Sequence, residues 1–231
     1  MESTAKLRIG VLLILIVVAL VSSLLGVLPT SDWKGLALNF GTEMAGAVVT
    51  YLLLELVIGR MERREAEREA EKKEREEKKA NLIAQMGSRV NDVAIAAAEE
   101  LARRGWLTDG SLQGAQLAGA NLPKADLIAA NLQEADLVRA NLQGAHLFMA
   151  NLQRANLSDA DLRETVLGRA DLQGAGLDGT DLQRATLIGA NLQGATLNEN
   201  TILPDGTKWT QDTDMARFTD PKHPDFWRPD A

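Results

Sequence analysis

Cysteine is absent from the 231-residue sequence, and histidine occurs only twice. The absence of cysteine excludes disulfides, thiolate metal sites and cysteine nucleophiles. Two histidines give little material for an imidazole-based metal site or general base. We therefore expect no metal ion, no cofactor and no catalytic residue.

Aromatic residues are also scarce: they make up 4% of the chain, although 45% of it is hydrophobic. A core built on large rings is not expected, and leucine and alanine supply most of the apolar mass instead. The net charge is -7. This mild acidity argues against a general nucleic-acid binder, which usually carries a clustered basic surface.

The first long apolar run covers residues 9–31 and contains no charged side chain. Its 23 residues are enough to cross a bilayer as a helix. A cleaved signal peptide is the alternative, because Lys6 and Arg8 precede the run. The run is too long for that interpretation, and no small-residue cleavage motif follows it, so we expect a membrane anchor.

A second, weaker span is predicted over residues 35–58, which would complete a two-helix transmembrane hairpin over residues 1–59. The short turn between the spans contains Trp33, a typical interfacial residue. Basic residues precede the first span and follow the second. The positive-inside rule then predicts a multi-pass protein of the bacterial inner membrane, with its N-terminus and the rest of the chain in the cytoplasm.

The second span carries polar residues on one helix face, at i, i+4, i+7 and i+11: Asn39, Glu43, Gly46 and Thr50. A carboxylate near mid-membrane costs about 2.5–3.5 kcal/mol, so Glu43 should be protonated or partnered. The favoured interpretation is packing against the first helix or another subunit. A proton or ion relay is the alternative.

Residues 60–80 are predicted to form a charged stalk, since 17 of the 20 residues from 60 to 79 are charged. Glutamates precede lysine or arginine by four residues, as in Glu69 and Lys73, which supports a helix. A solvated helix of this length would extend about 30 Å. A disordered charged linker is the alternative.

Residues 81–107 are predicted to be a helical cap, interrupted near Gly87. Ser88 is the expected N-cap and Gly105 the residue that ends the helix. An apolar stripe is expected on one helix face, from Val90, Val93, Ala94, Ala97 and Leu101.

A five-residue repeat dominates residues 108–203. Leucine occurs at position 112 and at every fifth position through 197, 18 times in succession. The residue two before leucine is alanine in 15 cases, and the exceptions are Gly110, Thr165 and Thr180. A period of five fits neither a helix nor a simple strand. A chain that turns a corner every five residues keeps every leucine inside.

The number of sides in each coil follows from the residue after leucine. It is glutamine at 113, 133, 153, 173 and 193, a spacing of twenty. Coils with four sides would stack these glutamines into an amide ladder, whereas three-sided coils would scatter them. A ten-residue duplication is the alternative, because Gln143 and Gln183 lie between.

The repeated pattern Ala-[Asn/Asp]-Leu-x-x resembles the pentapeptide-repeat family. The resemblance implies a right-handed quadrilateral β-helix, with leucine and the residue two before it pointing inward and the other three facing solvent. Val166, Gly176, Thr186 and Thr196 depart from the polar residue before leucine. The hairpin and charged helix also look like those fused to such repeats in some bacterial members.

Residues 204–231 are predicted to form a C-terminal cap or tail. Four large aromatic residues occur there after a run nearly free of them: Trp209, Phe218, Phe226 and Trp227. We expect them to cover the last coil, because an open coil exposes its apolar interior. A tail that binds a partner is the alternative.

Outward-facing positions of the repeat include an apolar stripe at twenty-residue spacing: Ile128, Phe148, Met149, Val166 and Ile188, with His146 beside them. Exposed apolar stripes often mark interfaces. Scattered surface hydrophobic residues are also common, which is the alternative.

The predicted function is a non-catalytic interaction or scaffold module anchored in a lipid bilayer. We expect a protein partner and a homo-oligomer joined through the hairpin or the stripe, and no nucleic acid. Some members of the resembled family mimic DNA and act on type II topoisomerases by means of an acidic rod. Residues 111–200 carry only ten acidic and six basic residues, so this alternative ranks second. A membrane sensor or channel subunit using Glu43 ranks third.

Overall fold

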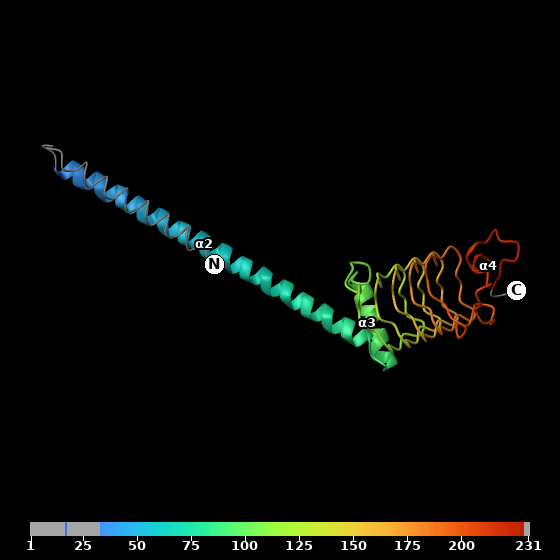
Figure 1. Ribbon diagram of the computed structural model, residues 1–231. Helices are drawn as coiled ribbons and strands as arrows, with labels where there is room; N and C mark the ends of the chain where they lie inside the picture. The colour runs from blue at the N-terminus through green and yellow to red at the C-terminus, as the bar shows by residue number, and fades with distance from the viewer. Residues whose placement is uncertain (1–16, 18–32, 229–231) are drawn as a thin grey trace. The chain divides into compact units, whose positions relative to one another are not determined.

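The computed structural model describes the backbone of residues 17 and 33–228 and the side chains of residues 17 and 45–228. The chain divides into two compact units, residues 1–74 and 75–231. Helix α2, Trp33–Met86, contributes to both units (Figure 1). Helices α3, Asn91–Arg103, and α4, Ala216–Thr219, belong to the second unit and lie at the two ends of a stack of coils (Figure 1).

Helix α2 continues without a break from the predicted second span into the charged segment, over 54 residues. In the part of the chain that the structure describes, no helix combines the length and the apolarity needed to cross a membrane. The first predicted span, residues 9–31, lies outside the described residues except for Val17. The side chains of Asn39 and Glu43 lie outside them as well.

Helix α3 covers the first coil with an apolar face, whose buried residues are Ala94, Ala97, Ala98 and Leu101. Two predicted members of this face are wrong, because Val90 and Val93 are 59% and 41% exposed. Gly105 ends the helix as predicted: its φ is +69°, and its N–H donates to the carbonyl oxygen of Ala102.

The predicted N-cap at Ser88 is also wrong, because α3 begins three residues later. The Ser88 hydroxyl accepts the N–H of Val90 at 3.0 Å. The Ser88 carbonyl accepts the N–H of Asn121 at 2.9 Å. These bonds tie the segment before α3 to the first coil, and the helix can start only after it.

The coils have four sides and a period of twenty residues, as predicted. Parallel bridges join residues twenty apart, such as Asn121 with Asn141. Two backbone hydrogen bonds join each side to the same side of the next coil. The leucine N–H donates to that coil, as from Leu132 to the Asn151 carbonyl at 2.8 Å. The carbonyl two residues before the leucine accepts from it, as Ala130 does from the Asn151 N–H at 2.9 Å. Within residues 33–228 each side holds a single bridge and no longer strand, because the chain turns after every five residues.

Each corner is a tight turn in which leucine's carbonyl accepts the N–H three residues on, as between Leu132 and Ala135 at 3.1 Å. The residue two after leucine has a positive φ at all seventeen corners from 114 to 194, as type II turns require. Ten of these residues are not glycine, for example Arg139 at 56°. The stacked hydrogen bonds therefore impose a conformation that costs most residues about 1 kcal/mol.

The interior of the coils is a column of leucine and alanine, and the leucines from Leu112 to Leu187 are at most 2% exposed. The two threonines that replace alanine within this column are buried and hydrogen-bonded. The Thr165 hydroxyl donates to the Leu162 carbonyl at 2.6 Å, and the Thr180 hydroxyl donates to that of Leu177. Threonine is therefore accepted at this position because the preceding turn supplies an acceptor.

The predicted glutamine ladder is wrong. The amide of Gln153 donates to the Asp171 carboxylate instead. Side chains do bond from coil to coil at the residue just before leucine, whose backbone forms the bridge to the next coil. Asn151 donates to Asn131 at 3.2 Å, and Asn191 donates to Asp171 at 2.9 Å. The short asparagine arm at a bridged position matches the spacing between coils, whereas the longer glutamine arm points away from the bridge.

The C-terminal segment folds over the last coil. Phe218 is buried, and Trp209 and Trp227 pack against the core. The rings of Phe218 and Trp227 meet edge to face, with 6.0 Å between their centroids. This aromatic cluster lies where the sequence predicts a cap.

Candidate interaction surface

One side of the coils, here called the apolar side, gathers all six residues of the predicted stripe. Bridges place His146 between Asp126 and Val166, and Val166 next to Thr186. The residues that follow on the same side are then in register, twenty apart. The apolar side consists of residues 126–129, 146–149, 166–169 and 186–189.

Large exposed hydrophobic residues of the coils occur on this side. Ile128 is 49% exposed, Met149 55% and Ile188 46%, and residues 107–228 contain no other large hydrophobic side chain of comparable exposure. Phe148 and Val166 are half-buried between them. These side chains lie on one side of the coils and are not scattered over all four, which is the observation that singles this surface out.

Phe148 packs over Gly168, which leaves the equivalent position in the next coil without a side chain. A Cβ atom added to Gly168 would lie 3.2 Å from Cδ2 of Phe148. The guanidinium of Arg169 is 6.0 Å from the centroid of the same ring. The phenyl ring therefore bridges two coils and fills the gap that glycine leaves.

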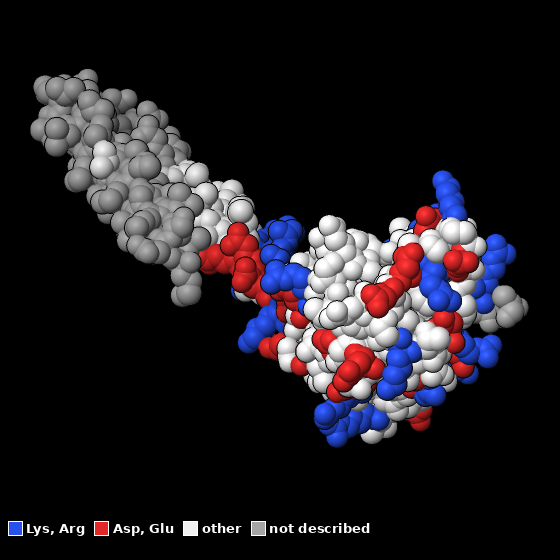
Figure 2. Space-filling model, turned by 45° about the vertical axis from the view of Figure 1, so that its right-hand side comes forward, with Lys and Arg blue, Asp and Glu red and all other residues white. Residues whose placement is uncertain are grey.

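The other sides of the coils carry mixed charges that pair across coils. Arg139 lies 3.7 Å from Asp159, and Arg154 lies 3.5 Å from Glu134. Acidic and basic side chains accordingly lie next to one another on the face shown in Figure 2. This arrangement produces no field of one sign.

Arg163 makes the tightest of these ion pairs. Its Nη2 is 2.6 Å from Oδ2 of Asp161, and its Nε is 2.9 Å from Oδ1. The hydrogen bond from Arg163 lowers the pKa of Asp161, and Asp161 raises the pKa of Arg163. Asp181, one coil further, lies 3.8 Å from the same guanidinium.

Residues that could hold a metal ion do not cluster anywhere in the described part of the chain. His146 is exposed on the apolar side, and its neighbours in register are Asp126 and Val166. The structure gives His146 no second ligand that would make a metal site.

Trp106, which with Leu107 is predicted to cover the start of the coils, also makes contacts with cations that the sequence does not predict. The indole is 3% exposed and lies within 5.0–5.6 Å of three cations: Arg75, Lys79 and Arg104. Lys79 also bonds to Asp109 at 3.2 Å. The cluster fixes the end of α2 to the start of the coils, and no local pattern reveals it because its members are up to 31 residues apart.

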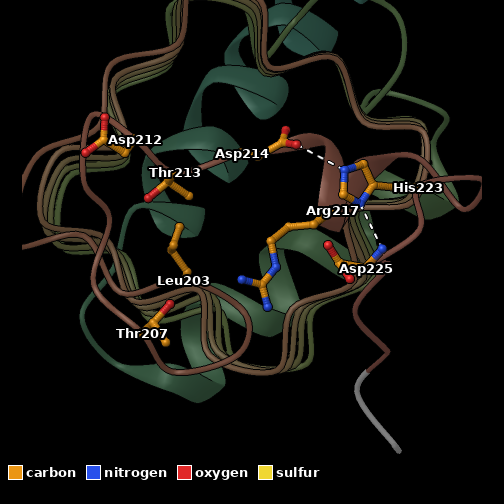
Figure 3. A pocket seen from close by; sticks show the side chains of 8 residues that line it. All are labelled: Leu203, Thr207, Asp212, Thr213, Asp214, Arg217, His223 and Asp225. Carbon is orange, nitrogen blue, oxygen red and sulfur yellow. Dashed lines mark hydrogen bonds and ion pairs between the residues drawn. The ribbon is translucent and has the colours of Figure 1, made fainter.

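A polar pocket of 490 Å³ lies at the C-terminal end of the coils (Figure 3). Arg217 points into it and pairs with Asp205 at 3.0 Å. His223 is engaged at both ring nitrogens: Nε2 lies 3.0 Å from Asp214, and Nδ1 accepts the N–H of Asp225. His223 thus links three parts of the C-terminal segment to one another.

Similarity to a known protein family lies in the repeat region. The model of the pentapeptide repeats family matches eight copies, over residues 111–147, 150–187 and 167–199. A pentapeptide repeat protein from Nostoc Pcc 7120 is 31% identical over 53% of this chain and 90% of its own, with a TM-score of 0.27. The chain belongs to the pentapeptide-repeat family.

Two further solved structures of pentapeptide-repeat proteins are similar. Rfr23 from the cyanobacterium Cyanothece 51142 is 36% identical over 39% of this chain, with a TM-score of 0.39, and the match spans 62% of its own length. A protein from the Arabidopsis thaliana thylakoid lumen is 29% identical over 44% of this chain and 70% of its own, with a TM-score of 0.40. No curated protein matches the chain. Pentapeptide-repeat proteins are generally structural or interaction modules without catalytic activity.

Outside the repeats, α2 exposes large hydrophobic residues over residues 48–57. Six of them are 49–60% exposed: Val48, Val49, Leu52, Leu53, Leu56 and Val57. Of the predicted polar face, the described residues Gly46 and Thr50 are joined by the Thr50 hydroxyl, which donates to the Gly46 carbonyl at 2.8 Å. The predicted roles of Asn39 and Glu43 stay predictions.

Proposed function

We propose that this pentapeptide-repeat protein is a membrane-anchored, non-catalytic scaffold that binds a protein partner through its apolar side. The observation that carries the proposal is that Ile128, Met149 and Ile188, the large exposed hydrophobic residues of the coils, all lie on one side. Burying such a row of side chains against a partner removes apolar area from water. The ladder of hydrogen bonds makes the surface rigid, so little conformational entropy is lost on binding.

The exposed hydrophobic residues on α2 support the anchor. Half-exposed valine and leucine side chains over residues 48–57 are unfavourable in water and favourable in lipid. The uncharged run over residues 9–31 supports it too. Basic residues precede the first predicted span and follow the second, which favours a bacterial inner-membrane location with the coils in the cytoplasm.

The charge pattern does not favour DNA mimicry. A mimic needs a continuous acidic surface, whereas arginines here neutralise Asp159, Glu134 and Asp161.

Affinity capture of the full-length chain from native membranes tests the proposed function. We expect Ile128→Asp and Ile188→Asp to lose a protein partner that the parent chain retains. Val138→Asp is the matched control, because Val138 occupies the equivalent outward position on another side. Thermal unfolding of each variant checks that the coils remain folded. The same set of captured proteins for the parent and both apolar-side variants would contradict the proposal.

A further inference from the structure

The hydrogen-bond ladder between coils ends at the last coil, and residues 190–194 form one of the edges that it leaves open. In the coil before it, three bonds hold this side: the Ala170 carbonyl accepts the N–H of Asn191 at 3.0 Å, Leu172 N–H donates to the Asn191 carbonyl at 2.8 Å, and Gly174 N–H donates to that of Gln193 at 2.9 Å.

The equivalent groups one coil further are the Ala190 carbonyl oxygen, the Leu192 N–H and the Gly194 N–H. None of the three has a hydrogen-bond partner among residues 33–228. They repeat the spacing and direction of the three bonds made one coil earlier. The edge therefore has the hydrogen-bonding groups needed to bind one more five-residue segment.

The C-terminal segment bonds to two other sides of the last coil. Leu182 N–H donates to the Ile202 carbonyl at 2.8 Å, and Arg184 N–H donates to that of Pro204 at 2.9 Å. On the apolar side, Gly189 N–H donates to the Thr219 carbonyl at 2.8 Å. Among the described residues the chain thus supplies ladder bonds to these two sides, whereas the N–H groups of Leu192 and Gly194, like that of Leu197 on the following side, have none.

The open edge is also accessible. Asn191 and Gln193 are exposed, and Leu192 is only partly buried, whereas Leu172 is 0% exposed. A Cβ atom added to Gly194 would meet only the backbone nitrogen of the preceding coil, at 4.0 Å. Apart from Gly194 and its two chain neighbours, no other heavy atom of the described residues lies within 4 Å of that position.

We propose that residues 190–194 bind an extended segment of another protein by strand addition. The segment runs parallel to the last coil. Its central side chain, of the size of leucine, lies over Leu192, and the residues of the segment on either side of it are polar. Its N–H reaches the Ala190 carbonyl, and two of its carbonyls accept from Leu192 and Gly194. Exposed ladder edges bind extended peptides in this way, with main-chain bonds for affinity and side-chain pockets for specificity. The site lies outside the apolar side, so it stands independently of the proposed function.

Hydrogen exchange with residue resolution, on the full-length chain in detergent, tests the proposal. The probe is a capped peptide with the sequence of residues 150–155, Ala-Asn-Leu-Gln-Arg-Ala. At ten times its Kd, the peptide should slow exchange of the Leu192 and Gly194 amides roughly tenfold. The amides of Leu172 and Gly174, already bonded, should exchange at unchanged rates.

The matched control is the same peptide methylated on the backbone nitrogen of its asparagine, which removes the donor to Ala190 and keeps every side chain. It should leave the exchange of Leu192 and Gly194 unchanged. The proposal is overturned if the unmodified peptide fails to slow these amides at millimolar concentration, or if the methylated peptide slows them equally. It is overturned as well if the free chain self-associates with both amides already protected, since a second copy then occupies the edge.

Discussion

The phenyl ring of Phe148 lies over Gly168, the residue at the equivalent position in the next coil. The contact is specific in both directions: the glycine leaves room for the ring, and the ring covers backbone that would otherwise face solvent. The same relation recurs at corners, where the Lys124 side chain lies 3.3 Å from a Cβ built on Gly144. In both pairs a large side chain on one coil packs against a glycine on the next.

Gly168→Ala should displace the Phe148 ring, because the added methyl carbon would lie 3.2 Å from it. We expect a loss of about 0.5–1.5 kcal/mol in unfolding free energy, since the ring is at the surface and moves outward. In a Phe148→Ala background the same substitution should cost less, giving a coupling energy of at least about 0.5 kcal/mol in a double-mutant cycle. Equal costs in both backgrounds would show that the two residues do not interact.

Leu147→Ala should cost about 2–5 kcal/mol, because Leu147 is 0% exposed and its removal leaves a cavity within the column. His146→Ala, at the adjacent exposed position, should change the unfolding free energy by less than about 0.5 kcal/mol. The midpoint of thermal unfolding separates the two variants. Similar midpoints would mean that Leu147 does not face the interior.

Thr165→Val tests the polar exception within the core. The substitution keeps the shape and removes the hydroxyl that donates to the Leu162 carbonyl at 2.6 Å. We expect a loss of about 1 kcal/mol in unfolding free energy. A variant as stable as the parent would show that the hydroxyl contributes nothing, and Thr165→Ala, which matches the repeat, provides the comparison.

The Asp161–Arg163 pair should make stability depend on pH. Its hydrogen bond lowers the pKa of Asp161 below the ordinary value of 3.8, so the stabilisation is complete above that value and is lost as pH falls through the lowered pKa. Thermal unfolding midpoints measured from about pH 5 to pH 2 should fall less in Asp161→Asn than in the parent. Arg163→Gln should reduce the fall to the same extent, and a parent-like pH profile in either variant would exclude the pair as a cause.

Sequence periodicity is sufficient to predict the coils because the constraint is local and repeated. Each leucine from Leu117 to Leu187, and the alanine or threonine two residues before it, occupies the buried inward position that the five-residue period predicts. The apolar side follows from the same period, since residues twenty apart must stack. The predictions that fail depend on contacts outside the period: Ser88 is tied to Asn121, and the Gln153 amide bonds to Asp171.

The Trp106 cluster and the open edge at residues 190–194 show the limit of pattern reasoning. Arg75 and Trp106 meet because α2 ends beside the first coil, which no nearby residue pair indicates. The edge depends on where the chain goes after Leu197. One additional residue enters there, since Asp181 bridges Ile202 and not residue 201. The leucine repeat ends at Leu197, so the sequence beyond it gives no register from which this one-residue shift could be predicted.

Disulfide formation between paired cysteines tests the stacking of the apolar side most directly, because the natural chain has no cysteine to interfere. Residues in register on adjacent coils lie within the range that a disulfide can join, about 4.4–6.8 Å between Cα atoms. The double variant Ile128→Cys with Phe148→Cys, twenty residues apart, should crosslink rapidly under mild oxidation. The pair Gln133→Cys with Phe148→Cys, fifteen apart, should stay reduced. Crosslinking of the second pair in preference to the first would contradict the four-sided coil, and with it the apolar side itself.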